Sequence, residues 1–127
     1  MPTVYGNSNS GNCHKVSRVL DTLGMVYDWV EVDTRNGGSR TPFFLTINPA
    51  GQVPAVVLDD GRTLAQSNAI LAYFAAGSQL LPTEPYALAK VNEWLFWEQY
   101  SHEPYVAVAR HQIISGRASH DSLDPVL

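Results

Sequence analysis

The chain has 127 residues, of which 45% are hydrophobic and 16% are charged, and its formal net charge at neutral pH is −4. This balance predicts one folded globular domain with room for an appendage, and it excludes a disordered chain. The negative charge argues against nucleic acid or an anionic membrane as a partner, because no stripe of Lys and Arg could neutralise phosphates. One cysteine permits no intrachain disulfide. Neither a leader sequence nor an apolar run of about 20 residues is evident, so we expect a soluble protein of the cytoplasm.

The chain begins with two predicted strands that flank a helix. Residues 3–5 form a short apolar run that ends at Gly6. From Gly11, apolar residues recur at helical spacing until Gly24, where the helix is expected to stop. Residues 26–32 are rich in β-branched and aromatic side chains and predict the second strand. Together these elements predict a β-α-β unit.

Further elements complete the first 77 residues. Thr41 and Pro42 are typical of the cap and the first residue of a helix. Residues 55–65 predict a hairpin around the turn "DDG". Ser67 is a cap candidate for a helix that ends at Gly77. The order β-α-β-α-β-β-α predicts an α/β domain with a mixed sheet.

The remaining residues predict a linker and a long helical stretch. Residues 78–86 contain proline and are expected to form the linker, and the helical stretch starts at Ala87. Pro104 is expected to kink or break that helix, and the sequence after Ile114 predicts a loop. Aromatic side chains lie on more than one face of the helix, which predicts burial on two sides. These side chains are Trp94, Phe96, Trp97 and Tyr100.

Three stretches of the sequence resemble glutathione transferases. The stretch "NPAGQVPAVVLDDGRTLAQSNAILAYFA" (48–75) has the Val-Pro that precedes a hairpin in this family, then an amide residue and a serine that open a helix. The stretch "YGNSNSGNCHKV" (5–16) is similar to the family's first strand, active-site loop and first helix. The stretch "NEWLFWEQYSHEP" (92–104) resembles the first helix of the family's all-helical second domain.

The resemblance implies a domain organisation. Residues 1–77 would form a thioredoxin-like, glutathione-binding domain with the β-α-β-α-β-β-α order. Residues 78–86 would be the linker, and residues 87–127 a partial all-helical domain. Family members have several helices in that second domain, whereas this sequence predicts about one. We therefore expect a truncated relative that lacks most of the wall for the electrophilic co-substrate.

Ser10 and Cys13 are the candidates for chemistry in the first loop. Their spacing is that of a CxxC redox motif in which serine replaces the leading cysteine. A serine before an apolar helix is usually an N-cap. The resemblance implies a catalytic role as well: in serine-type transferases this hydroxyl donates a hydrogen bond to the thiolate of glutathione. For Cys13 we favour a buried packing role over a mixed disulfide with glutathione, and for Tyr5 a packing role over that of a tyrosine-type catalyst.

The energies make a catalytic Ser10 plausible. Lowering the pKa of a thiol by about two units needs about 2.7 kcal/mol of preference for the thiolate. One hydrogen bond to a charged group supplies about 1.5–3 kcal/mol. The positive end of the helix that starts near Gly11 adds about 0.3–1 kcal/mol. One hydroxyl and one helix terminus are therefore sufficient.

The resemblance also implies residues that bind the rest of glutathione. Val53, before a cis Pro54, would offer its backbone to the extended tripeptide as a sheet edge does. Gln66 and Ser67 would meet the γ-glutamyl carboxylate at a helix N-terminus, although Ser67 is also a cap candidate.

Other residues are weaker candidates. Gln52 and Arg40 would reach the glycyl end of glutathione, and His102 would face the site from the helical domain. The four histidines of the chain show no ligand spacing, so we predict no metal.

The leading hypothesis is therefore a glutathione transferase that joins the glutathione thiolate to small hydrophobic electrophiles, as in detoxification, and acts as a homodimer. The first alternative is a glutathione-dependent thiol-disulfide oxidoreductase that uses Cys13. The second is a truncated, non-catalytic module for glutathione binding or protein interaction.

Overall fold

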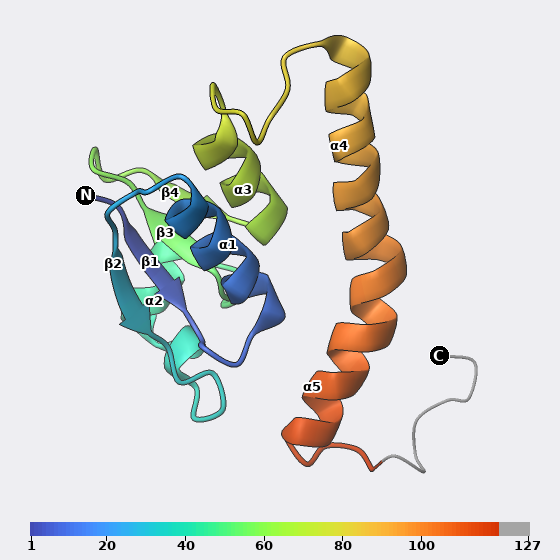
Figure 1. Cartoon of the computed structure of the whole chain (residues 1–127). Helices are drawn as coiled ribbons and strands as arrows, with labels where there is room; N and C mark the ends of the chain where they lie inside the picture. The colour runs from blue at the N-terminus through green and yellow to red at the C-terminus, as the bar shows by residue number, and fades with distance from the viewer. Residues whose placement is uncertain (120–127) are drawn as a thin grey trace. The chain divides into compact units, whose positions relative to one another are not determined.

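The chain forms two compact units (Figure 1). The computed structural model describes residues 1–119. The first unit is Met1–Leu81, and the second begins at Pro82, so the division falls inside the predicted linker at residues 78–86. Of the predicted C-terminal loop, residues 120–127 lie outside the described residues.

The first unit is built on a four-stranded sheet with the order β2-β1-β3-β4. Strand β1 (Thr3–Gly6) pairs in parallel with β2 (Asp28–Glu31). On its other side β1 pairs antiparallel with β3 (Ala55–Val57), which pairs antiparallel with β4 (Thr63–Ala65). The mixed sheet and the β-α-β-α-β-β-α order are therefore confirmed.

Helices cover both faces of this sheet (Figure 1). On one face, α1 (Gly11–Thr22) and α3 (Ser67–Ala75) pack against each other. Their shared core with the sheet consists of Val4, Val16, Leu20, Val56 and Ile70. On the other face, the short helix α2 (Pro42–Ile47) follows the 3-10 turn η1 (Gly38–Arg40). Its core consists of Val32, Phe44, Ile47 and Ala55.

Local sequence explains where these helices begin. Ser10 and Thr41 occupy the N-caps of α1 and α2, and their hydroxyls accept backbone N–H bonds from Cys13 and Phe44. Each such cap stabilises a helix by about 1 kcal/mol. The predicted cap of α3 is wrong, because that helix starts one residue earlier than expected: Ser67 is its first helical residue and Gln66 is its N-cap.

The second unit is one continuous helical rod over its described part (Figure 1). It consists of α4 (Pro85–Trp97), the π-helical segment η2 (Glu98–Ala107) and α5 (Val108–Ile114). The helix begins two residues before the predicted start, because Glu84 accepts hydrogen bonds from the first free N–H groups. Pro104 lies inside η2, so the helix continues through it with a wider turn and does not break.

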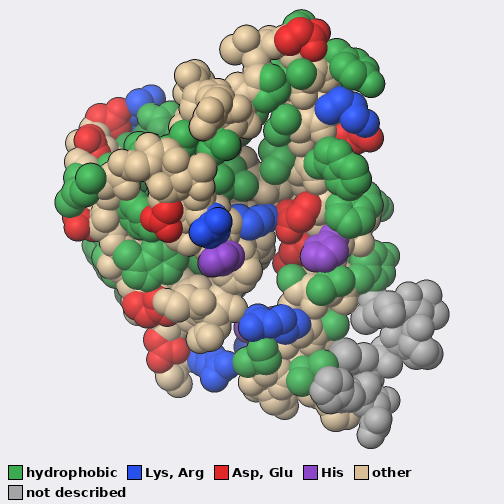
Figure 2. Space-filling view, viewed as in Figure 1, with side chains coloured by type: hydrophobic (Ala, Val, Ile, Leu, Met, Phe, Trp, Pro, Cys, Tyr) green, Lys and Arg blue, Asp and Glu red, His purple; other side chains and the backbone are tan. Residues whose placement is uncertain are grey.

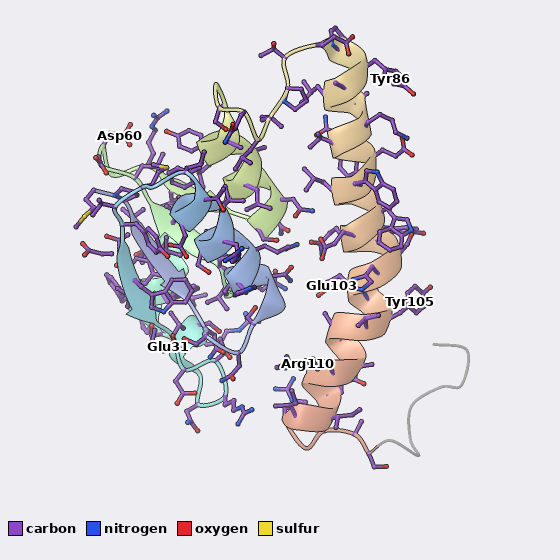
Figure 3. All side chains as sticks on the ribbon, viewed as in Figure 1. Glu31, Asp60, Tyr86, Glu103, Tyr105 and Arg110 are labelled. Atoms are coloured by element: carbon purple, nitrogen blue, oxygen red, sulfur yellow. The ribbon has the colours of Figure 1, made fainter. Side chains whose placement is uncertain are left out.

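The aromatic side chains of this helix are not buried. No residue of α4, η2 or α5 is buried, and Tyr100 is 84% exposed. Hydrophobic side chains are visible along much of the rod (Figure 2), and Tyr86 and Tyr105 project from the same side of it (Figure 3). The predicted burial on two sides is therefore not observed, because the described part of this unit holds no second helix for these side chains to pack on. Within residues 1–119, no helix has both the length and the apolar character that a membrane crossing requires.

Candidate active site

The loop between β1 and α1 is shaped by Asn7. The Asn7 side chain donates to the carbonyl of Val32 at 3.0 Å and accepts from the N–H of Asn9 at 3.0 Å. Its backbone carbonyl accepts from the N–H of Ser10 at 2.9 Å. These bonds fold residues 7–10 into a turn, and this turn places Ser10 at the start of α1.

Ser10 is half-buried at the N-cap of α1. Its backbone is extended, with φ −88° and ψ 122°, and its Oγ accepts from the N–H of Cys13 over 3.4 Å. The bond is long, so the hydroxyl is held only weakly. A hydroxyl beside free helical N–H groups lies in the positive field of a helix terminus, which favours an anion such as a thiolate.

Cys13 is fully buried one turn into the same helix. Burial raises the pKa of its thiol, and this outweighs the lowering by hydrogen bonds from the Ser10 side chain and the Asn7 N–H. The negative charge of Glu31 raises the pKa further. A thiol with a raised pKa carries little thiolate at neutral pH, which makes Cys13 a poor nucleophile.

The N-terminus of α3 lies beside that of α1. The buried hydroxyl of Ser67 donates to Oδ1 of Asn12 at 3.4 Å, and the ammonium of Lys15 donates to Oδ1 of Asn68 at 3.1 Å. Two helix termini that both favour anions are thus joined side by side. Gln66 caps the second of them without a side-chain cap bond, and its side chain is exposed.

The backbone of Gln66 is unusual. Among the described residues other than glycine, it alone has a positive φ, with φ 70° and ψ 112°. A non-glycine residue in such a conformation costs about 1–3 kcal/mol, and strain of this kind concentrates at functional sites.

The loop before β3 is organised by the buried side chain of Asn48. Its Nδ2 donates to the carbonyl of Gln52 at 2.7 Å, and its Oδ1 accepts from the N–H of Ala50 at 3.1 Å. The peptide bond between Val53 and Pro54 is cis, as the family resemblance implied. Val53 therefore lies at the amino end of β3, with Gln52 exposed beside it.

Arg40 lies against this loop. A Cβ added to Gly51 would come within 2.8 Å of the guanidinium carbon of Arg40. Arg40, the last residue of the turn η1 before α2, thus lies against Gly51, the residue before Gln52.

A family model described as "Glutathione S-transferase, N-terminal domain" matches residues 9–76, more than half of the chain. The chain belongs to the glutathione S-transferase family. Among solved structures, a glutathione S-transferase from Pseudomonas fluorescens is 46% identical, with a TM-score of 0.89 over 94% of this chain and 60% of that one. A glutathione transferase homologue from Sulfitobacter with bound glutathione is 28% identical, with a TM-score of 0.75 over 87% of this chain and 56% of the other.

Curated relatives include enzymes and a regulator. Glutathione S-transferase 3 of Zea mays is 35% identical over 116 residues, which are 87% of this chain and 51% of the relative. Protein URE2 of Candida glabrata is 34% identical over 118 residues, 86% of this chain and 33% of the relative. The protein of that name in Saccharomyces cerevisiae is called "Transcriptional regulator URE2". The chain spans between about a third and a half of these curated relatives.

Two predicted candidates do not belong to the loop between β1 and α1. The ring of Tyr5 packs on Phe43 and Phe44 with centroid distances of 6.2 Å, on the α2 face of the sheet. His102 belongs to the second unit, where its ring lies 5.6 Å from that of Trp97.

Several residues of the site carried no clear signal in the sequence. Asn7, Asn12 and Asn68 all contribute side chains to the joined loop and helix termini. Asparagine after a strand is a general turn signal, but it does not indicate which partner it will bind. Their roles depend on contacts between segments that are distant in the sequence.

A shallow hollow of about 450 Å³ lies elsewhere on the first unit. It is lined by Pro2, Met25, Leu58, Asp59, Asp60, Tyr73 and Phe74. Because Pro2 precedes β1 and Ser10 follows it, the hollow and Ser10 lie at opposite ends of the sheet. Asp60 and Glu31 mark these two ends in Figure 3. The hollow is therefore separate from the candidate active site.

Proposed function

We propose that this chain binds glutathione and that the Ser10 hydroxyl stabilises its thiolate for transfer to an electrophile. The observation that carries the proposal is the pairing of two helix N-termini, with Ser10 capping one and Gln66 the other, joined through Ser67 and Asn12. This arrangement offers a hydroxyl and two positive helix ends to one anionic ligand. The family membership and the bound glutathione in the Sulfitobacter homologue support glutathione as that ligand.

Each part of glutathione has a partner in this proposal. The γ-glutamyl carboxylate meets the N-terminus of α3, where Gln66 and Ser67 lie. The cysteinyl backbone pairs with Val53, and the sulfur reaches Ser10. The glycyl carboxylate lies toward Arg40, which lies against Gly51, and toward Gln52, the next residue along the chain.

The reaction needs only the thiolate and an acceptor. The glutathione sulfur forms a bond to the electrophilic carbon, and the leaving group departs with the electron pair of the broken bond. Ser10 donates its proton as a hydrogen bond to the sulfur and keeps it throughout. At about 1.5–3 kcal/mol, that bond lowers the pKa of the glutathione thiol by about one to two units.

The oxidoreductase alternative depends on Cys13 and is disfavoured by the environment of that thiol. Its sulfur is fully buried and its pKa is raised. Attack on a disulfide requires an accessible thiolate.

A non-catalytic binding module is the second candidate. It is favoured by the regulator among the relatives. Both candidates share the glutathione site and differ in turnover. The exposed aromatic side chains of the second unit fit the homodimer that we propose for either one.

The Ser10→Ala variant tests the catalytic role. We expect the pKa of bound glutathione, followed by thiolate absorbance, to rise by one to two units. Conjugation at neutral pH should fall about 10- to 100-fold, because a hydrogen bond of about 1.5–3 kcal/mol is lost.

Because Ser10→Ala also removes a helix cap, Thr41→Ala serves as the control: it removes the cap of α2 and leaves Ser10 in place. This variant should lose a similar amount of stability, about 1 kcal/mol, and leave the thiol pKa unchanged. If both variants ionise glutathione as the unaltered chain does, Ser10 is only a cap. If the unaltered chain ionises glutathione but no electrophile is conjugated, the non-catalytic module is favoured.

A further inference from the structure

The carboxylate of Glu31 accepts hydrogen bonds from the loop between β1 and α1 and from a neighbouring side chain. Its Oε1 accepts from the N–H of Ser8 at 2.9 Å, and its Oε2 accepts from the Ser8 hydroxyl at 2.7 Å. Oε2 also accepts from the indole N–H of Trp29 at 2.9 Å. Glu31 is the last residue of β2 and lies at that end of the first unit in Figure 3. Both oxygens of one exposed side chain are thus occupied by protein donors.

Trp29 is fixed on its other side by β1. A Cβ added to Gly6 would come within 2.4 Å of the indole ring, so the ring lies directly over that glycine. Gly6 is the last residue of β1 and the residue before the loop. Because only glycine leaves this space, Trp29 holds the Glu31 side chain close to the start of the loop.

The loop has few other attachments to the sheet. Asn7 binds the carbonyl of Val32, the residue after Glu31. Ser8 and Asn9 are exposed. In the hydrogen bonds described above, both the N–H and the hydroxyl of Ser8 donate to Glu31. Glu31 and Val32, at the end of β2 and just after it, therefore bind Ser8 and Asn7, the two residues at the start of the turn that precedes Ser10.

We propose that Glu31 is a positioning residue that holds residues 7–10 so that the Ser10 hydroxyl is aimed at the sulfur of bound glutathione. This inference rests on the proposed function. A donor fixed before the ligand arrives stabilises a developing charge more effectively than one that must reorganise. A carboxylate suits the task because it accepts with both oxygens, and bonds to an ionised acceptor are stronger than neutral ones.

The charge of Glu31 itself works against a thiolate. It already raises the pKa of the nearby Cys13 thiol, and like charges so close disfavour each other's ionised forms. If Glu31 acted on glutathione through charge alone, its removal would lower the pKa of the bound thiol. If it acts by positioning Ser10, its removal raises that pKa. The two roles therefore predict opposite signs.

The experiment compares Glu31→Ala and Glu31→Gln with Asp60→Ala in the full chain. Asp60 is a suitable control because it is also an exposed carboxylate that binds a neighbouring side chain, Arg62, at the other end of the sheet. Three quantities are measured: amide hydrogen exchange of residues 8–10 without ligand, the pKa of the bound glutathione thiol, and the Kd of S-methylglutathione, which has no thiol to ionise.

We expect faster exchange in Glu31→Ala and a rise of about one unit in the thiol pKa, which is a tenfold loss of thiolate at neutral pH. Glu31→Gln should show a smaller change in the same direction, because an amide offers one acceptor oxygen. The Kd of S-methylglutathione should stay within about twofold, since Ser10 stabilises the charge and not the tripeptide. Asp60→Ala should match the unaltered chain in all three quantities.

A fall or no change in the thiol pKa of Glu31→Ala, with the unaltered chain ionising glutathione normally, overturns the positioning role and leaves the proposed function intact. Unchanged hydrogen exchange also overturns it. If the unaltered chain does not lower the thiol pKa at all, the proposed function fails and the inference fails with it. Should Glu31→Ala not fold, the sign of the change in Glu31→Gln decides the question.

Discussion

Gln66 shows, at the scale of one residue, a strained backbone at a position for which we propose a binding role. Its φ of 70° is a conformation that glycine adopts far more easily than a residue with a Cβ. The side chain makes no cap bond to α3 and is exposed. Neither a cap bond nor burial within residues 1–119 therefore accounts for a glutamine here, whereas the proposed contact with the γ-glutamyl group does.

We expect Gln66→Gly to stabilise the chain by about 1 kcal/mol and to weaken glutathione binding. The matched variant Gln66→Ala removes the same side chain but keeps a Cβ at a positive φ, so it should weaken binding without a gain in stability. Thermal unfolding and calorimetric titration of both variants measure the two effects. A Gln66→Gly variant that is less stable than the unaltered chain would show that the backbone is not strained.

At the scale of elements, the contact between Gly6 and Trp29 holds β1 against β2. We expect Gly6→Ala to destabilise the first unit by about 1–3 kcal/mol. The added Cβ would come within 2.4 Å of a carbon atom of the Trp29 indole ring, which is too close for two carbon atoms. Gly11→Ala is the control: it opens α1, no atom lies within 4 Å of the added Cβ, and the change should be neutral or slightly stabilising. Denaturant unfolding measures both variants, and equal stabilities would contradict the contact.

The elements of the first unit could be predicted from local patterns. Spacing of apolar residues located α1, and the Thr41 cap and the DDG turn located α2 and the hairpin. The α3 cap was predicted wrongly because Ser67 is a strong capping residue in isolation. In the fold its hydroxyl faces Asn12, which lies 55 residues away. That partner is supplied by tertiary packing of two helices, and no local pattern contains it.

The candidate site likewise has residues that short stretches of sequence indicate and contacts that only the fold reveals. Ser10, Val53, Pro54 and Gln66 could be proposed because they lie in short recognisable stretches. The contact between Glu31 and Ser8 spans 23 residues and joins a strand end to a loop. Each residue alone looks like a solvated surface side chain, so only the parallel pairing of β1 with β2 reveals their relation.

At the scale of the whole molecule, the two units differ in how they are stabilised. The first has buried clusters on both faces of its sheet. The second has no buried residue between Pro85 and Ile114. The proposed glutathione contacts, apart from the predicted His102, come from the first unit. On this proposal, we expect glutathione binding to require little from the helical rod.

The most direct test is a calorimetric titration of the 127-residue chain with reduced glutathione, beside Ser67→Ala and Ser17→Ala. Ser67 lies in the proposed site, whereas the Ser17 hydroxyl donates to the carbonyl of His14 in an exposed hydrogen bond within α1. We predict saturable binding at one site per chain, weakened by Ser67→Ala and unchanged by Ser17→Ala. A folded chain that shows no binding heat at millimolar glutathione, with binding also absent by equilibrium dialysis, would contradict the glutathione site.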